Sequence, residues 1–168
     1  TMAKVYTKTG DAGSTGLYTG ERVSKASQRV CTYGTIDEAQ AFLGVARAYS
    51  DKKVVQDTLL QLEKELWMIM ADISSLGQEA TITDEHVTNL EQIIDKFDEQ
   101  LEPLSKFILP GDSKTSSFLH LGRTIVRRAE RDLWKLGETE EIHMSNLRYL
   151  NRLSDLLFIL ARVEDEVK

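Results

Sequence analysis

Leucine and isoleucine recur at intervals of three and four residues between positions 59 and 76, and this spacing constrains the fold most strongly. The series consists of Leu59, Leu62, Leu66, Ile69, Ile73 and Leu76. Residues three and four apart lie on one face of an α-helix, so the series predicts a single amphipathic helix with a continuous apolar stripe. Such a stripe is stable only when it is buried against other elements of the fold.

The same periodicity returns in three later segments of the chain. Thr83 is the predicted N-cap of a helix that carries acidic residues in its first turn and ends before Pro103. Further helices are expected over about 114–137 and about 142–165. Gly137 is expected to be the residue just past the end of the first of these two.

An earlier helix is expected over about 35–50, with Thr35 as its N-cap and Glu38 completing a capping box. Residues 4–34 are expected to be mostly irregular, and 106–112 (KFILPGD) to form a loop that exposes apolar groups. No segment shows a sustained alternation of apolar and polar residues, which would indicate a β-strand. The sequence therefore predicts an all-α fold, a five-helix antiparallel bundle of the ferritin-like or four-helix-bundle type, preceded by a Gly/Thr-rich N-terminal loop.

Length and charge narrow the class of protein. A chain of 168 residues predicts a single domain over 1–168, divided into the loop segment 4–34 and the helical bundle 35–168. A net charge of −6 argues against general nucleic-acid binding. The sequence contains no run of about 18 apolar residues, so no membrane-spanning helix is predicted. The lone Cys31 cannot form an intramolecular disulfide, and no signal-like segment opens the chain, so a cytoplasmic location is expected.

The segment TKTGDAGSTG (7–16) has the composition of a phosphate-binding loop. Small residues let the backbone approach a ligand closely, Lys8 supplies a positive charge, and hydroxyl groups suit phosphate oxygens or hydrated Mg²⁺. The spacing does not match a Walker A motif. An ordinary flexible turn is the alternative interpretation.

Three arginines, Arg123, Arg127 and Arg131, recur every four residues and so share one face of a helix. None of these three has an acidic residue four positions further on, and Arg128 beside them is interpreted as unbalanced too. Unpaired guanidinium groups on adjacent turns repel one another unless an anion lies across them, and a triphosphate suits their paired donors. A solvated charged face is the alternative.

Other polar residues have more than one interpretation. Asn151 offers the paired donor and acceptor that read an adenine edge, but it also fits an exposed helix face. Asp37 sits in the expected first turn of a helix, where a carboxylate is favourable anyway. A single Glu-x-x-His pair, Glu140 and His143, does not make a di-iron site, and no protein-bound metal is expected.

Five stretches, in order along the chain, together carry a family resemblance. They are TKTGDAGSTGLYTGERVSK (7–25), RVCTYGTIDE (29–38), KFILPGD (106–112), LHLGRTIVRRAER (119–131) and YLNRLSDLLFILAR (149–162). These stretches resemble the PduO-type ATP:corrinoid adenosyltransferases. The resemblance implies a homotrimer of five-helix bundles that transfers the 5′-deoxyadenosyl group of ATP to cob(I)alamin and releases triphosphate, with active sites between subunits.

The resemblance also implies roles for individual residues. ATP contacts from one subunit fall on Thr7, Lys8, Thr9, Gly10, Asp11, Thr15, Gly16 and Lys25, and those from the next on Arg127, Arg128, Glu130, Arg131 and Asn151. Asp37 and Arg123 match an intersubunit ion pair, and with Arg127 they are the expected catalytic residues. Phe107 matches the aromatic residue below the corrin ring. Gln40, Asp112 and Gly122 depart from the common pattern.

Cofactors and partners follow from the same resemblance. It implies Mg²⁺ with ATP, a cobalamin or related corrinoid as the second substrate, a flavin-dependent cobalamin reductase and an adenosylcobalamin-dependent client enzyme. Two other functions remain open from the residues themselves. One is an ATP-responsive bundle that carries adenosylcobalamin without making it, and the other is a helical interaction module that binds no ATP.

Overall fold

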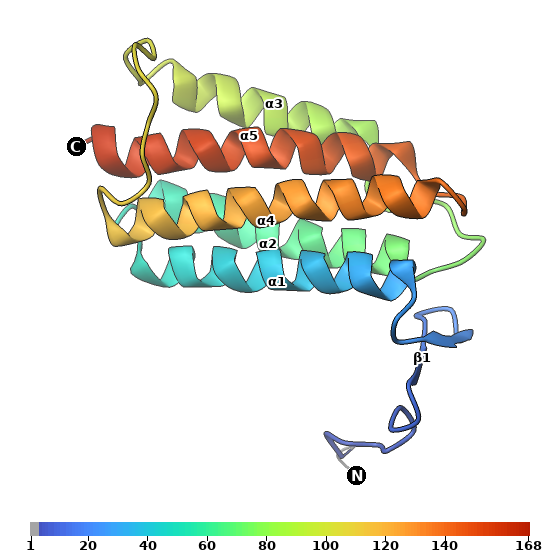
Figure 1. Ribbon diagram of the computed structural model, residues 1–168. Helices are drawn as coiled ribbons and strands as arrows, with labels where there is room; N and C mark the ends of the chain where they lie inside the picture. Colours follow the sequence, from blue (N-terminus) through green and yellow to red (C-terminus); the bar gives the residue numbers. More distant parts are fainter. Residues whose placement is uncertain (1–3) are drawn as a thin grey trace.

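The computed structural model describes residues 4–168 and consists of five long helices and one short hairpin (Figure 1). In chain order the elements are β1 (Ser14–Gly16), β2 (Arg22–Ser24), α1 (Gln28–Tyr49), α2 (Lys53–Ile73), α3 (Asp84–Asp98), α4 (Lys114–Gly137) and α5 (Met144–Glu166). The predicted all-α class with five helices is confirmed. No helix of the described chain is both long and apolar enough to cross a bilayer.

Four helices close the bundle, and the remaining one lies outside it. α1 packs against α2 and α4, α4 also packs against α5, and α2 touches α5. α3 packs mainly on α5. Consecutive helices run in opposite directions along the bundle (Figure 1). The predicted antiparallel five-helix bundle is therefore confirmed, with α3 as an added layer.

The apolar stripe of α2 lies in the centre of the core. Leu59, Leu62, Leu66 and Ile69 are completely buried, and burial of each such side chain contributes about 1.5–3 kcal/mol. Leu76, the last member of the predicted stripe, lies beyond the end of α2 and is exposed. The buried Asp72 carboxylate, near the end of α2, accepts hydrogen bonds from the Thr81 and Ile82 amides and so holds the segment that leads to α3 against the helix.

The predicted start of α1 is wrong. The helix begins seven residues earlier, at Gln28, after an N-cap at Ser27 whose side chain accepts from the Val30 amide. Thr35 lies inside the helix, where its hydroxyl is 2.7 Å from Asp132 Oδ2 and 3.0 Å from the Cys31 carbonyl. A threonine that bonds back to the preceding turn and across to α4 has the same local sequence signature as a cap.

Two other helix ends show why caps are hard to read. The predicted N-cap at Thr83 is confirmed, and Thr83 also forms a capping box with the His86 imidazole. Gly137 is the last residue of α4 and is not in the left-handed conformation of a C′ glycine, so the prediction for it is wrong. A Cβ at Gly137 would lie 2.6 Å from Ile142 Cδ1, so glycine serves the tight packing of the α4–α5 turn.

The N-terminal segment holds more regular structure than predicted. β1 and β2 pair antiparallel, with Thr15 opposite Val23. The Tyr18 amide donates to the Ser74 carbonyl at 2.8 Å, which fixes the hairpin to the end of α2. Residues before β1 extend away from the bundle (Figure 1). Residues 4–34 are therefore irregular only in part, because they contain the hairpin and the first turns of α1.

Candidate functional site

The arginine row of α4 borders a hollow between three helices. Arg123 and Arg127 line a hollow of about 350 Å³ together with side chains from α3 and α5. Within residues 4–168, no ion pair involves Arg123, Arg127 or Arg131. Arg123 Nε is buried and has no hydrogen-bond partner in this part of the chain. Asp98 and Asp155 line the same hollow, but none of the three guanidinium groups has an ion-pair partner among the described residues. Guanidinium groups on consecutive turns are an arrangement suited to an anion.

Arg128 differs from the other arginines of α4. Its Nη2 forms an ion pair with Glu38 Oε2 of α1 at 2.7 Å, and its Nη1 lies 3.4 Å from the Thr35 hydroxyl. The interpretation of Arg128 as an unbalanced charge is therefore wrong, because Glu38 of the neighbouring helix pairs with it. Both charged groups are about half exposed, and exposed pairs of this kind contribute at most about 1 kcal/mol.

Asp37 lies on the exposed side of α1 and forms no ion pair within the described residues. It lines a second hollow of about 350 Å³ between α1 and α2, which also contains Gln40 and Trp67. The Gln40 amide donates to the Glu63 carbonyl at 2.8 Å, so the longer side chain at this position joins α1 to α2. Asp37 and Arg123, predicted as an ion pair, do not pair within one chain.

The predicted phosphate-binding loop is a folded turn braced from the hairpin. Arg22 Nη2 lies 3.0 Å from the Thr9 carbonyl and 2.9 Å from Ser14 Oγ. Lys8 has a φ of 64°, which is rare for a residue with a side chain. The bracing role of Arg22 was not predicted, because strands of only three residues are too short to show a recognisable hydrophobic period.

Lys25 closes over the same loop. A Cβ at Gly10 would lie 2.9 Å from Lys25 Nζ and 3.1 Å from the Ser14 carbonyl, so glycine is required for this close approach. The Lys25 amide also donates to the Gly13 carbonyl at 2.9 Å. The predicted residues Gly10 and Lys25 therefore come together, while the Lys8 ammonium lies 5.9 Å from the centroid of the Tyr6 ring.

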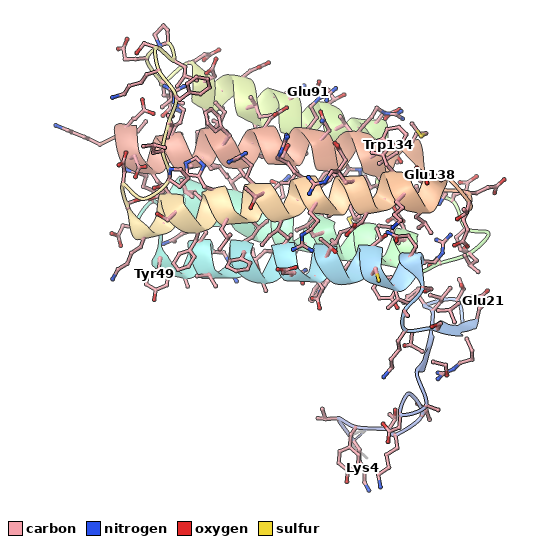
Figure 2. The ribbon with its side chains drawn as sticks, in the orientation of Figure 1. Lys4, Glu21, Tyr49, Glu91, Trp134 and Glu138 are labelled. Atoms are coloured by element: carbon pink, nitrogen blue, oxygen red, sulfur yellow. The ribbon has the colours of Figure 1, made fainter. Side chains whose placement is uncertain are left out.

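The structure does not bring this loop to the arginine row within one chain. Figure 2 shows Lys4 at the far end of the N-terminal segment, well away from the bundle, while Trp134 and Glu138 lie on the end of α4. No hydrogen bond in the described chain joins residues 7–16 to α4 or α5. The remaining loop residues predicted to bind ATP are placed with this segment: Thr7, Thr9, Asp11, Thr15 and Gly16.

Two further predicted nucleotide contacts lie on α4 and α5. Asn151 is exposed on α5, and its Oδ1 accepts from Arg152 Nη1 at 2.8 Å. Glu130 is half-buried on α4 and takes part in no ion pair within residues 4–168. The carboxylate of Glu140, considered above as a metal ligand, pairs with Arg29 at 3.3 Å. Across the described chain, no three His, Cys, Asp or Glu side chains gather closely enough to hold a metal ion.

Phe107 is 99% exposed in the segment 99–113, which connects α3 to α4 without a helix. The loop predicted over 106–112 is thus confirmed. This segment and the N-terminal hairpin lie at opposite ends of the bundle (Figure 1), and α4, with 24 residues, spans about 36 Å. Gly122, near the middle of α4, permits close packing on α1, since a Cβ there would lie 3.3 Å from Leu43 Cδ2.

Comparison with known proteins identifies a family. Residues 5–164 match the family model described as cobalamin adenosyltransferase. A corrinoid adenosyltransferase of Bacillus subtilis is 48% identical over 166 residues, which cover 95% of this chain and 86% of that protein. The corrinoid adenosyltransferase PduO of Salmonella typhimurium is 40% identical over 96% of this chain, and the match covers 49% of the longer protein.

Solved structures agree with the sequence comparison. A variant PduO-type ATP:corrinoid adenosyltransferase from Lactobacillus reuteri, complexed with cobalamin and ATP, superposes with a TM-score of 0.90 at 31% identity, over 95% of this chain and 89% of that chain. A second variant of that protein, complexed with ATP, gives a TM-score of 0.90 at 32% identity, over 96% and 94% of the two chains. Because the family model spans nearly the whole chain, this protein belongs to the cobalamin adenosyltransferase family and is of the PduO type.

Proposed function

We propose that this chain transfers the 5′-deoxyadenosyl group of ATP to the Co(I) centre of a reduced corrinoid such as cob(I)alamin, with release of triphosphate. The observation that carries the proposal is the row of Arg123, Arg127 and Arg131. Arg123 and Arg127 line a hollow, and none of the three forms an ion pair in residues 4–168. The names of the relatives and the cobalamin and ATP bound to the Lactobacillus reuteri protein support it.

The chemistry explains why a polyanion site is the main requirement. The cobalt(I) electron pair of the substrate attacks C5′ of ATP, the C5′–O bond breaks, and its electrons leave with triphosphate. The nucleophile carries no proton, so the reaction needs no general base. The protein must align C5′ with cobalt and neutralise the departing charge, and good alignment alone lowers the barrier by roughly 7–11 kcal/mol.

We place each active site between two subunits of a homotrimer. The loop of residues 7–16 with Lys25 would bind ATP from one subunit, and Arg127, Arg128, Glu130, Arg131 and Asn151 would bind it from the next. Asp37 would pair with Arg123 across the same interface. The support is that the loop extends away from its own bundle (Figure 2) and that neither Asp37 nor Arg123 has an ion-pair partner within residues 4–168.

Phe107 would pack against the lower face of the corrin ring. Its nearly complete exposure in the single chain makes the side chain available for such a contact. An apolar ring in this place excludes a lower axial ligand, and four-coordinate Co(II) is easier to reduce to the nucleophilic Co(I). A flavin-dependent cobalamin reductase is the proposed source of the electron, and an adenosylcobalamin-dependent enzyme in the cytoplasm is the proposed recipient of the product.

Mg²⁺ would enter with the triphosphate of ATP. No cluster of three metal-ligating side chains exists among residues 4–168. The hydroxyl groups of residues 7–16 suit a hydrated Mg²⁺, whose remaining ligands would be phosphate oxygens and water.

The test is an anaerobic reaction of the protein with Mg-ATP and chemically reduced cobalamin. We expect the Co(I) absorption band to disappear and light-sensitive adenosylcobalamin and triphosphate to form in equal amounts. Formation of ADP and phosphate would contradict the proposed bond cleavage. Tight ATP binding without any product would favour the carrier function, and absence of ATP binding would favour the interaction module.

A further inference from the structure

His120 of α4 is a buried imidazole that neither the proposed chemistry nor the family comparison uses. The residue is 4% exposed, and its Nδ1 has no hydrogen-bond partner within the described residues. Burying a polar atom without a partner costs free energy. A purely structural core position would be filled more favourably by an apolar ring, so the imidazole calls for an explanation.

The location of His120 links two parts of the proposed site. On one side its ring meets Phe158 of α5 edge to face, with centroids 6.1 Å apart and planes at 64°. Phe158 lines the same hollow as Arg123 and Arg127. On another side His120 lines a separate hollow of about 220 Å³ behind the segment 99–113, the segment that carries Phe107.

The charge state of His120 affects both sides. Burial lowers the pKa of His120, and the Arg123 guanidinium one turn along α4 lowers it further. The negative charges of Asp165 of α5 and Asp112 of the segment 99–113 raise this pKa in part. Other charged residues that line the same hollow are Glu102 and Lys106 from the segment 99–113 and Arg162 and Glu166 from α5. The net effect keeps the imidazole neutral at neutral pH.

Protonation of His120 would change the packing around the hollow. A new cation would stand near Arg123, whose Nε is already buried without a partner in residues 4–168. The same cation would attract Asp112, which lies at the end of the segment that carries Phe107. Repulsion on one side and attraction on the other would displace both walls of the proposed corrinoid site.

We infer that His120 is a positioning residue whose neutral ring holds Phe158 and the segment 99–113 in the arrangement that accepts the corrinoid. This inference rests on the proposed function, because it assumes that Phe107 and the hollow beside Arg123 contact the corrinoid. ATP binding, which is assigned to the loop of residues 7–16 and to Arg127, should not depend on it.

The experiment compares wild type with His120→Phe and His120→Ala between pH 8 and pH 5.5. Cobinamide is the corrinoid, because it lacks the lower nucleotide base, which would itself titrate. KM for cobinamide, KM for ATP and Tm are measured for each protein. Binding of cob(II)inamide, followed by its absorption spectrum, gives a Kd that does not require turnover. Tyr149→Phe is the matched control, because it also removes a buried polar group but belongs to the contact with Glu65.

In wild type we expect KM for cobinamide to be constant at higher pH and to rise only at pH values below the usual histidine pKa of about 6.5, because the pKa of His120 is lowered. His120→Phe retains an aromatic ring against Phe158 and loses no hydrogen bond at Nδ1. It should therefore bind cobinamide normally at pH 8 and lose the pH dependence. His120→Ala should raise KM for cobinamide about tenfold at pH 8, and KM for ATP should stay constant in every case.

Three results would overturn the inference. They are a flat wild-type profile, an unchanged pH dependence in His120→Phe, and an alanine variant that lowers Tm but leaves corrinoid affinity intact. Failure of the proposed function is distinguishable, because wild type would then form no adenosylated product at any pH. The Kd for cob(II)inamide would still decide whether His120 controls corrinoid binding.

Discussion

Arg128 of α4 and Glu38 of α1 form an ion pair, with Nη2 2.7 Å from Oε2. Arg127, the neighbour of Arg128 in sequence, instead lines the hollow beside α5. Consecutive residues of a helix point about 100° apart, so the two arginines face different helices. One charge is compensated by the chain itself, and the other has no ion-pair partner within residues 4–168.

Replacement of Arg127 by alanine tests this distinction. Because Arg127 is exposed and unpaired in the described chain, Arg127→Ala should leave Tm unchanged while kcat/KM falls by roughly 10²–10³. Steady-state kinetics and thermal unfolding measure the two effects. Arg148→Ala is the control, since Arg148 is an exposed arginine paired with Asp84 of α3, and it should keep full activity. Full activity in Arg127→Ala would refute the site assignment.

Mixed trimers test whether each site is shared between subunits. Chains carrying Lys8→Ala and chains carrying Arg127→Ala should each be inactive alone. If one subunit supplies the loop and the next supplies α4, a mixed trimer contains a site with both wild-type residues. Co-refolding of the two variants should then restore activity, measured as adenosylcobalamin formed. A mixture as inactive as its components would show that each site is built within a single chain.

The contact between Gly10 and Lys25 predicts a selective loss of ATP affinity. Gly10→Ala would place a Cβ only 2.9 Å from Lys25 Nζ, and displacement of the ammonium should raise KM for ATP about tenfold, the equivalent of about 1.4 kcal/mol. Lys25→Ala should have a similar effect. The double variant should be no worse than Lys25→Ala alone, because both changes act on one interaction. If the increases in KM of the two single variants add up in the double variant, Gly10 affects ATP binding independently of Lys25.

The buried hydroxyl of Tyr149 predicts a loss of stability without a loss of function. Its OH donates to Glu65 Oε1 at 2.8 Å and joins α5 to α2, while burial, followed by the charge of Glu65, raises the pKa of Tyr149 well above its usual value. Tyr149→Phe leaves the buried Glu65 with one fewer partner. We expect urea unfolding to report a decrease of about 1–3 kcal/mol in the free energy of unfolding, with kcat and both KM values unchanged. An altered kcat would place Tyr149 in the site.

Helix periodicity was readable from the sequence because it reflects burial along one face. The stripe from Leu59 to Ile73 is in the core as predicted. Helix ends were less predictable, since they depend on partners distant in sequence. Thr35 resembled a cap but bonds to Asp132 of α4, and Gly137 resembled a C′ residue but makes room for Ile142.

The sequence by itself determined the five-helix class, the arginine row and the family, because each depends on residue types at fixed local spacing. Only the tertiary structure decided which charges remain free. It gave Arg128 a partner in Glu38 and left Asp37 and Arg123 without ion pairs within residues 4–168. It also separated the Gly/Thr-rich loop from α4 (Figure 1). The physical reason is that an ion pair or a shared hollow depends on how helices far apart in sequence pack, and spacing along one helix carries no information about its neighbours.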